Sequence, residues 1–154
     1  MRQLGLQQSK AVEVNVFIDG AWVESNSGKT FDVTNPATGD LLGTVPDGDG
    51  TDATKAIDAA SKAFPSWSST TAYERSRLLY RAWELMIERS EDLAQLMTAE
   101  QGKPLKASRA EVKYASDFLI WFAEEAKRVT GEWLPSQRPD QRFLSVKAPV
   151  GVVA

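Results

Sequence analysis

The sequence predicts an α/β fold in which short strands come first and four helices follow. Up to about residue 46, apolar residues alternate around turns that contain Gly or Pro, a pattern typical of β-hairpins. From about residue 50, apolar residues instead recur every three or four positions, which is typical of amphipathic helices. The segment Arg142–Ala154 is apolar again and resembles the approach to a further strand. Because natural domains rarely end within such a run, we expect the fold to be incomplete.

The composition excludes several classes of chemistry. The 154 residues contain neither Cys nor His, so disulfides, the usual zinc sites, thiolate nucleophiles and imidazole bases are excluded. The formal net charge is −3, so the chain has no excess of positive charge to attract nucleic acid or an anionic membrane. No apolar stretch approaches the roughly 20 residues that span a bilayer. We therefore expect a cytoplasmic protein that binds neither nucleic acid nor a membrane.

Two hairpins are predicted in the first third of the chain. Asp19-Gly20 tolerates the positive φ angles of a type I′ turn, so it can close the first hairpin. Residues 35–40 contain the Pro and Gly that punctuate the second turn. Residues 1–13 are expected to form a flexible tail. The predicted strands are Val14–Ile18, Ala21–Val23, Thr30–Thr34 and Leu41–Val45.

Helical periodicity begins after the acidic segment Asp47–Asp52. The first helix is expected to stop at Pro65, because proline lacks an N–H group and clashes with the preceding turn. Thr71 and Glu74 form a capping box, which predicts the start of the second helix. The predicted apolar faces are Ala53, Ile57, Ala60 and Phe64 in the first helix, and Leu78, Ala82, Leu85 and Met86 in the second.

Two further helices are predicted. Ser90 can cap the third, with Leu93, Leu96 and Met97 inside, and this helix is expected to end near Gly102. Pro104 suits the first position of the fourth, which is expected to run to Gly131. Residues 131–141 are then predicted to form an extended connector.

The fourth helix carries two apolar stripes. One stripe suffices to dock a helix on a core, so the second must face another element, a partner or a ligand cavity. Aromatic residues at helical spacing are more often core than ligand site, and both interpretations stay open. The first stripe is Val112, Ala115, Leu119, Phe122 and Ala126, and the second is Ala110, Tyr114, Phe118 and Trp121.

Three polar segments resemble ligand sites, but a structural interpretation is favoured for each. Ser25–Thr30 ends like a phosphate-binding loop, yet Val23 stands where that loop requires glycine. The acidic cluster of Asp47, Asp49, Asp52 and Asp58 is spaced somewhat like a calcium loop but lacks its glycine, so we expect a solvated cluster at a helix N-terminus. Glu100 lies at the junction of two helices, where a solvated charge is the simpler interpretation.

Seven segments in one order resemble the N-terminal signatures of the aldehyde dehydrogenase superfamily, most closely its succinate-semialdehyde branch. The resemblance covers residues 14–154. The segments are Phe17–Val23 (FIDGAWV), Asn35–Gly39 (NPATG), Phe64–Trp67 (FPSW), Glu74–Ser76 (ERS), Glu100–Pro104 (EQGKP), Trp121–Glu125 (WFAEE) and Pro149–Val152 (PVGV).

The resemblance implies the N-terminal strands and four helices of an aldehyde-dehydrogenase-like fold, truncated before the nucleotide-binding sheet is complete. The intact enzyme would use NAD or NADP to oxidise an aldehyde to a carboxylic acid and would form a homo-oligomer. We expect this chain to contain no catalytic and no cofactor-binding residue, since the catalytic Cys, the general base and the cofactor-binding turn of the family are missing. The isolated chain is therefore expected to be inactive and to bind no cofactor.

A few roles carry over from the resemblance. Ala110 and Tyr114 match positions that line the substrate entrance in relatives, and Phe118 continues the same stripe. The carbonyl of Val33 and the carboxylate of Glu100 match positions that hold a structural monovalent cation. The alternative to an enzyme segment is a short, non-catalytic module that binds other subunits or a small molecule.

Overall fold

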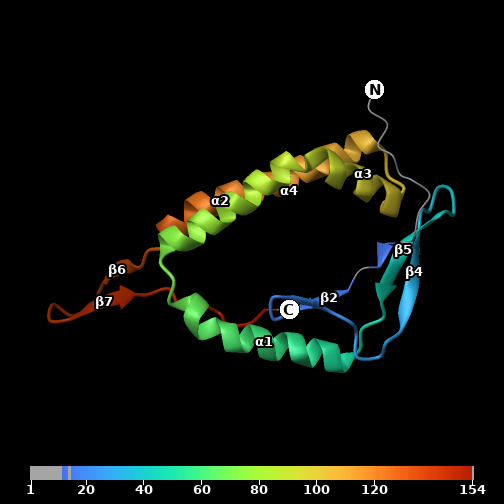
Figure 1. Ribbon diagram of the computed structural model, residues 1–154. Coiled ribbons are helices and arrows are strands. Elements are labelled where there is room, and N and C mark those ends of the chain that lie inside the picture. Colours follow the sequence, from blue (N-terminus) through green and yellow to red (C-terminus); the bar gives the residue numbers. More distant parts are fainter. Residues whose placement is uncertain (1–11, 14, 154) are drawn as a thin grey trace. The chain divides into compact units, whose positions relative to one another are not determined.

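The structure is a computed structural model that describes residues 12–13 and 15–153, and it confirms the predicted α/β fold (Figure 1). The described chain divides into two compact units. The first runs to Ala60 and includes Ala94–Ser108, and the second contains Ser61–Leu93 and the chain from Arg109 onward. Residues 1–11 of the predicted tail lie outside the described residues, and the prediction was wrong for Val12 and Glu13, which form a strand.

The first unit contains a three-stranded sheet and a separate hairpin. In the sheet the order is β1-β5-β4, with β1 parallel and β4 antiparallel to β5. The hairpin pairs β2 with β3 in an antiparallel manner. The strands are β1 (Val12–Glu13), β2 (Val16–Ile18), β3 (Ala21–Val23), β4 (Thr30–Thr34) and β5 (Leu41–Pro46).

Both predicted hairpin turns are confirmed. Asp19 and Gly20 have φ angles of 51° and 80°, the positive values that a type I′ turn requires. In the second turn the backbone N–H of Asn35 donates to the carbonyl of Asp40 at 2.8 Å, and Gly39 has a φ angle of 78°. These turns form from local backbone preferences, which is why the sequence predicts them well.

Four helices follow, as predicted, and a short 3₁₀ turn extends the last one. The capping box is present: Thr71 Oγ1 accepts from the Glu74 N–H at 3.2 Å, and Glu74 Oε2 accepts from the Thr71 N–H at 2.8 Å. Gly102 ends the third helix with a φ angle of 71°. The helices are α1 (Gly50–Ser68), α2 (Ala72–Glu88), α3 (Ser90–Gln101) and α4 (Leu105–Glu125), followed by η1 (Ala126–Arg128).

Two predicted helix ends were wrong. α1 continues through Pro65 to Ser68, and the hydroxyl groups of Ser66 and Ser68 donate to carbonyls of its last turns. Because Pro65 lies in the last turn, the helix loses only one backbone hydrogen bond there, and the two serine hydroxyls supply donors to carbonyls near its end. α4 ends at Glu125 rather than at Gly131, because the chain turns through η1 to begin a strand.

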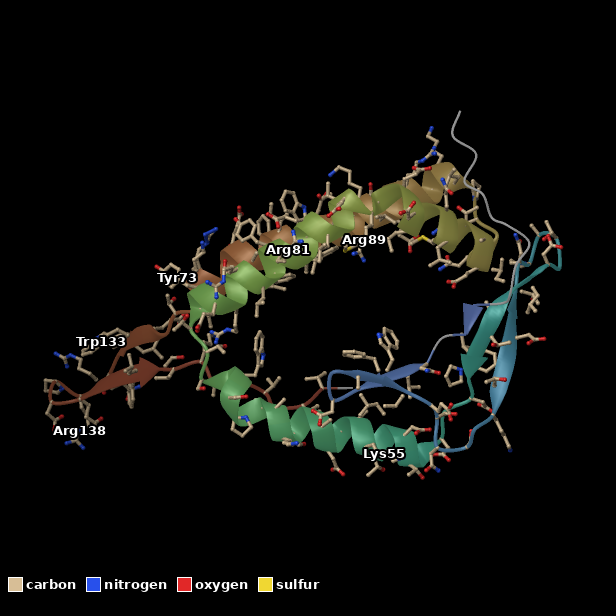
Figure 2. The ribbon with its side chains drawn as sticks, in the orientation of Figure 1. Lys55, Tyr73, Arg81, Arg89, Trp133 and Arg138 are labelled. Atoms are coloured by element: carbon tan, nitrogen blue, oxygen red, sulfur yellow. The ribbon has the colours of Figure 1, made fainter. Side chains whose placement is uncertain are left out.

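The predicted connector over residues 131–141 was also wrong. It contains β6 (Glu132–Pro135), which pairs with β7 (Arg142–Ser145) as an antiparallel hairpin. The prolines that favoured a connector lie at the end of β6 and in the turn. Figure 2 shows Trp133 and Arg138 on this hairpin. The described residues 150–153 form no strand, since no described strand pairs with them.

Few residues of the described chain are buried, and most of the buried residues have small side chains. Side chains predicted to lie inside remain exposed, with 53% for both Leu78 and Leu96 and 54% for Phe122. α4 buries a line of residues spaced by four and seven positions, which allows close helix packing. The buried apolar residues are Ala94, Val112 and Ala123, and the buried serines are Ser25, Ser76, Ser108 and Ser116.

Candidate functional site

The aromatic face of α4, which we define as Tyr114, Phe118 and Phe122, is the first candidate site. The Tyr114 and Phe118 rings meet edge to face, with centroids 4.9 Å apart, and the Phe118 and Phe122 rings stack at 6.4 Å. Tyr114 is 64% exposed and Phe118 46% exposed. Ala110 lies one turn before Tyr114 and is also exposed. The three predicted entrance residues therefore lie along one exposed face.

The structure corrects the predicted division of α4 into stripes. Phe122 belongs to the exposed aromatic face, and Ala115 is exposed as well. Ser108 and Ser116, which an apolar pattern does not detect, are fully buried. Thr98 and Ser108 hydroxyl oxygens lie 2.8 Å apart, so a hydrogen bond joins α3 to α4 at this point. The aromatic face is thus an apolar surface left uncovered by the described residues.

The aromatic face can contact an apolar part of a ligand, but it offers no acid–base chemistry. On neighbouring α2, burial, followed by the hydrogen bond to Glu124, raises the pKa of Tyr80 above its usual range. Hydrogen bonds from Thr71 lower the pKa of Glu74. Both shifts move the pKa away from neutral pH, whereas a general acid or base works best with a pKa near neutrality.

The second candidate is a polar network that joins the loop after β3 to the start of α1. The Asn26 N–H donates to both carboxylate oxygens of Asp52, at 2.9 and 3.1 Å, and the Asp49 N–H donates to Asp52 Oδ2 at 3.1 Å. Asp49 accepts from the Asn26 side-chain amide and caps the helix through the Thr51 N–H. Asp52 is only 6% exposed, so the prediction of a solvated acidic cluster was wrong for this residue.

This network also bears on the cofactor that the family implies. Gly48 and Gly50 join β5 to α1 with a spacing like that of a dinucleotide-binding turn. In such a turn the helix N–H groups bind the cofactor phosphates. Here the Thr51 and Asp52 N–H groups already donate to Asp49 Oδ1. Two carboxylates at this helix end would also repel a pyrophosphate, so this junction does not fit NAD(P).

The predicted cation ligands lie in the first unit. Val33 is half-buried in β4, and Glu100 is exposed in the last turn of α3. The neighbouring segments meet, because a Cβ atom added to Gly102 would lie 3.0 Å from Pro36 Cγ. In the described part of the chain, no cluster of three or more Asp or Glu residues is arranged to hold a metal ion. The site with Val33 stays a prediction, since it uses one carbonyl and one carboxylate.

Comparison with known proteins assigns the family. The profile of the aldehyde dehydrogenase family matches residues 22–154, and the chain therefore belongs to this family. It is 47% identical over 149 residues to the glutarate-semialdehyde dehydrogenase of Pseudomonas aeruginosa, and 45% identical over 149 residues to the NADP(+) succinate-semialdehyde dehydrogenase of Escherichia coli. Each match covers 97% of this chain and 31% of the relative.

Solved structures agree with this assignment. Succinate-semialdehyde dehydrogenase from Burkholderia pseudomallei superposes with a TM-score of 0.86 at 44% identity, over 90% of this chain and 29% of that one. Betaine aldehyde dehydrogenase from Staphylococcus aureus, in complex with NAD+, gives a TM-score of 0.83 at 37% identity, over 88% and 28%. Within the family, the chain matches the N-terminal part of enzymes of the succinate-semialdehyde type. It spans about three tenths of their length.

Within the described residues, no helix combines the length and the apolar content needed to cross a membrane.

Proposed function

We propose that this chain forms the N-terminal segment of an NAD(P)-dependent aldehyde dehydrogenase that oxidises an aldehyde to a carboxylic acid. The observation that carries the proposal is the 45–48% identity to four such dehydrogenases over nearly the whole chain. The same identity favours this function over a short, non-catalytic binding module. The segment supplies scaffold and surface, while the cofactor and the nucleophile are held elsewhere in such an enzyme.

The proposed substrate is an aldehyde that carries an anionic group at its far end. The first relatives are named for glutarate semialdehyde, succinate semialdehyde and 3-sulfolactaldehyde. Two of these compounds end in a carboxylate and the third in a sulfonate. A shared requirement for a negative end group supports this substrate class over neutral aldehydes.

A chimera tests this function directly. The matching 149-residue segment of the Escherichia coli relative is replaced by this chain. We expect the chimera to reduce NADP+ with succinate semialdehyde, because the two segments are 45% identical. The chain alone should give no cofactor reduction above the uncatalysed rate, since it has no Cys to attack the aldehyde. A folded chimera without aldehyde oxidation, or an active isolated chain, would contradict the proposal.

We also propose that Ala110, Tyr114 and Phe118 line the substrate entrance of that enzyme. Their exposure along one face of α4 supports this role. In the active chimera, Tyr114→Ala should raise KM for succinate semialdehyde more than it lowers kcat, because it changes access rather than chemistry. Tyr73→Ala, an exposed tyrosine on α2, is the matched control. Equal KM effects at the two positions would argue against an entrance.

A structural monovalent cation held by the Val33 carbonyl and Glu100 is a further part of this proposal. The contact between Pro36 and Gly102, close to both residues in sequence, supports it. In the chimera, potassium or sodium should raise the melting temperature, and Glu100→Gln should abolish that increase. Glu111→Gln is a control on α4. If the cation still raised the melting temperature of Glu100→Gln, Glu100 would not be a ligand of the cation.

We propose further that the enzyme is a cytoplasmic homo-oligomer. The many exposed apolar side chains support association, since large uncovered apolar surfaces are unusual in monomers. Light scattering of the chimera tests the oligomeric state. Fractionation of cells that produce the natural protein tests the cytoplasmic location.

A further inference from the structure

A hollow of about 380 Å³ in the second unit is lined by three basic side chains and by no acidic one. It lies where the start of α2, the turn η1 and the end of β7 come together. Its charged lining residues are Arg75, Lys127 and Lys147. A group of like charges around one hollow creates a positive potential that attracts anions.

The basic side chains of the hollow do not form the close ion pairs seen at other basic side chains of the described residues. Among the described residues, no ion pair is seen for Arg75, Lys127 or Lys147, whereas Arg109 pairs with Glu91 and Lys113 with Asp117. The Arg75 guanidinium donates to the Thr70 carbonyl, and Lys127 Nζ lies 5.9 Å from the centre of the Tyr73 ring. Tyr73, labelled in Figure 2, lies at the start of α2. These contacts hold two of the cations in place without neutralising them.

Glu74, which is next to Arg75 in the sequence and interacts with its charge, lies outside the hollow. Glu74 bonds to the Thr71 N–H and hydroxyl in the capping box, and it is not part of the lining. The rest of the lining is backbone and apolar, with Ala72, Val129 and Leu144 among it. The hollow therefore combines three positive charges with a largely apolar lining. This combination suits a compact anion better than a polypeptide strand or an apolar ligand.

We propose that this hollow binds a tetrahedral oxyanion, either inorganic phosphate or the phosphate group of a small phosphorylated metabolite. An Arg guanidinium offers paired donors and a Lys ammonium offers a point charge, and both are common phosphate ligands. The proposal does not depend on aldehyde oxidation, because the hollow shares no residue with the aromatic face of α4.

Equilibrium dialysis of the purified chain with radiolabelled phosphate tests the proposal. We expect saturable binding that sulfate displaces, because sulfate has the same shape and a similar charge. Chloride at equal ionic strength should leave it unchanged. If glycerol 3-phosphate competes at least about tenfold better than phosphate, the natural ligand is a phosphorylated metabolite. If it competes no better, the ligand is free phosphate.

Three variants assign the binding to the hollow. Lys127→Gln and Lys147→Gln should each weaken phosphate binding by about tenfold, since each removes one charge-assisted hydrogen bond. Lys147→Arg should retain binding. Lys106→Gln is the matched control, because Lys106 is an exposed lysine of α4 outside the hollow. Circular dichroism should show the same helix content in all four chains.

Either of two results would overturn the proposal. The first is the absence of saturable phosphate binding by the unmodified chain. The second is an equal loss of binding in Lys106→Gln and Lys147→Gln, which would indicate an effect of net charge alone.

Discussion

Asp52 shows how one side chain can join two segments that lie far apart in the sequence. Its carboxylate accepts N–H groups from Asn26 and Asp49 and is 6% exposed. A buried carboxylate is tolerated only when hydrogen bonds replace its lost water. Asp52 therefore holds the loop after β3 against the start of α1.

Replacing Asp52 with Ala should destabilise the first unit by about 1–3 kcal/mol, because two part-buried hydrogen bonds to a charged acceptor would be lost. Urea unfolding followed by circular dichroism measures this change. Asp58→Ala, at an exposed position of the same helix, is the control and should stay within about 0.5 kcal/mol. Similar values for the two variants would show that the network does not contribute to stability.

Asn26 also controls the titration of Asp49. The side-chain hydrogen bond from Asn26 is the largest cause of the lowered pKa of Asp49. A depressed folded-state pKa stabilises the folded chain above the unfolded value of about 4, and this contribution is lost as the pH falls through the folded value. Asn26→Ala should raise the Asp49 pKa toward its ordinary value in an NMR titration. Glu74 should titrate as before, and an unchanged Asp49 would disprove the assignment.

At the scale of elements, the start of α2 depends on its cap. Thr71→Ala should cost about 1 kcal/mol, because the Glu74 N–H loses its acceptor at the helix end. Thermal unfolding gives the change in stability. Thr71→Ser keeps the hydroxyl and should restore most of it. If the Ala and Ser variants melted together, the capping box would have no energetic role.

Gly131 matters for a different reason, the close approach of two backbones. A Cβ atom at this position would collide with the Ser145 carbonyl, next to the pair formed by Glu132 and Ser145. Gly131→Ala should therefore displace the start of the β6–β7 hairpin and weaken the cross-strand NOEs there. Gly50→Ala meets no atom within 4 Å and serves as the control. Intact cross-strand NOEs in Gly131→Ala would show that the added methyl group is accommodated without displacing the two strands.

For the whole molecule, exposed apolar surface is the dominant property. Trp121 is 62%, Trp133 67% and Leu144 67% exposed. Burial of apolar surface contributes about 25 cal/mol per Å², so we expect the purified chain to associate as its concentration rises. Light scattering across a dilution series measures this.

Charge substitutions identify the surfaces involved in this association. Phe118→Glu and Leu144→Glu should each reduce it, because a carboxylate resists burial in an apolar contact. Ser61→Glu, at an exposed position of α1, adds the same charge and should have little effect. A compact monomer at every concentration would contradict the expectation and favour a stand-alone module.

The sequence predicted features that depend on a few neighbouring residues. Asp19-Gly20 closes a hairpin and Thr71 with Glu74 caps a helix because the relevant hydrogen bonds and φ angles are local. The placement of Tyr114 and Phe118 on one face of a helix could also be predicted from their spacing, whereas their exposure could not. The seven family segments could be recognised in order for a similar reason, as each is a short local pattern.

Tertiary structure alone decided the properties that need distant partners. Whether Asp52 is solvated depends on Asn26, which lies 26 positions earlier in the chain. Ser108 is buried because Thr98 approaches it, while Phe122 is exposed because no described segment covers it. Arg75, Lys127 and Lys147 meet only once α2, η1 and β7 are packed together. Periodicity reports which side chains favour burial, but burial itself depends on which surfaces the fold brings into contact.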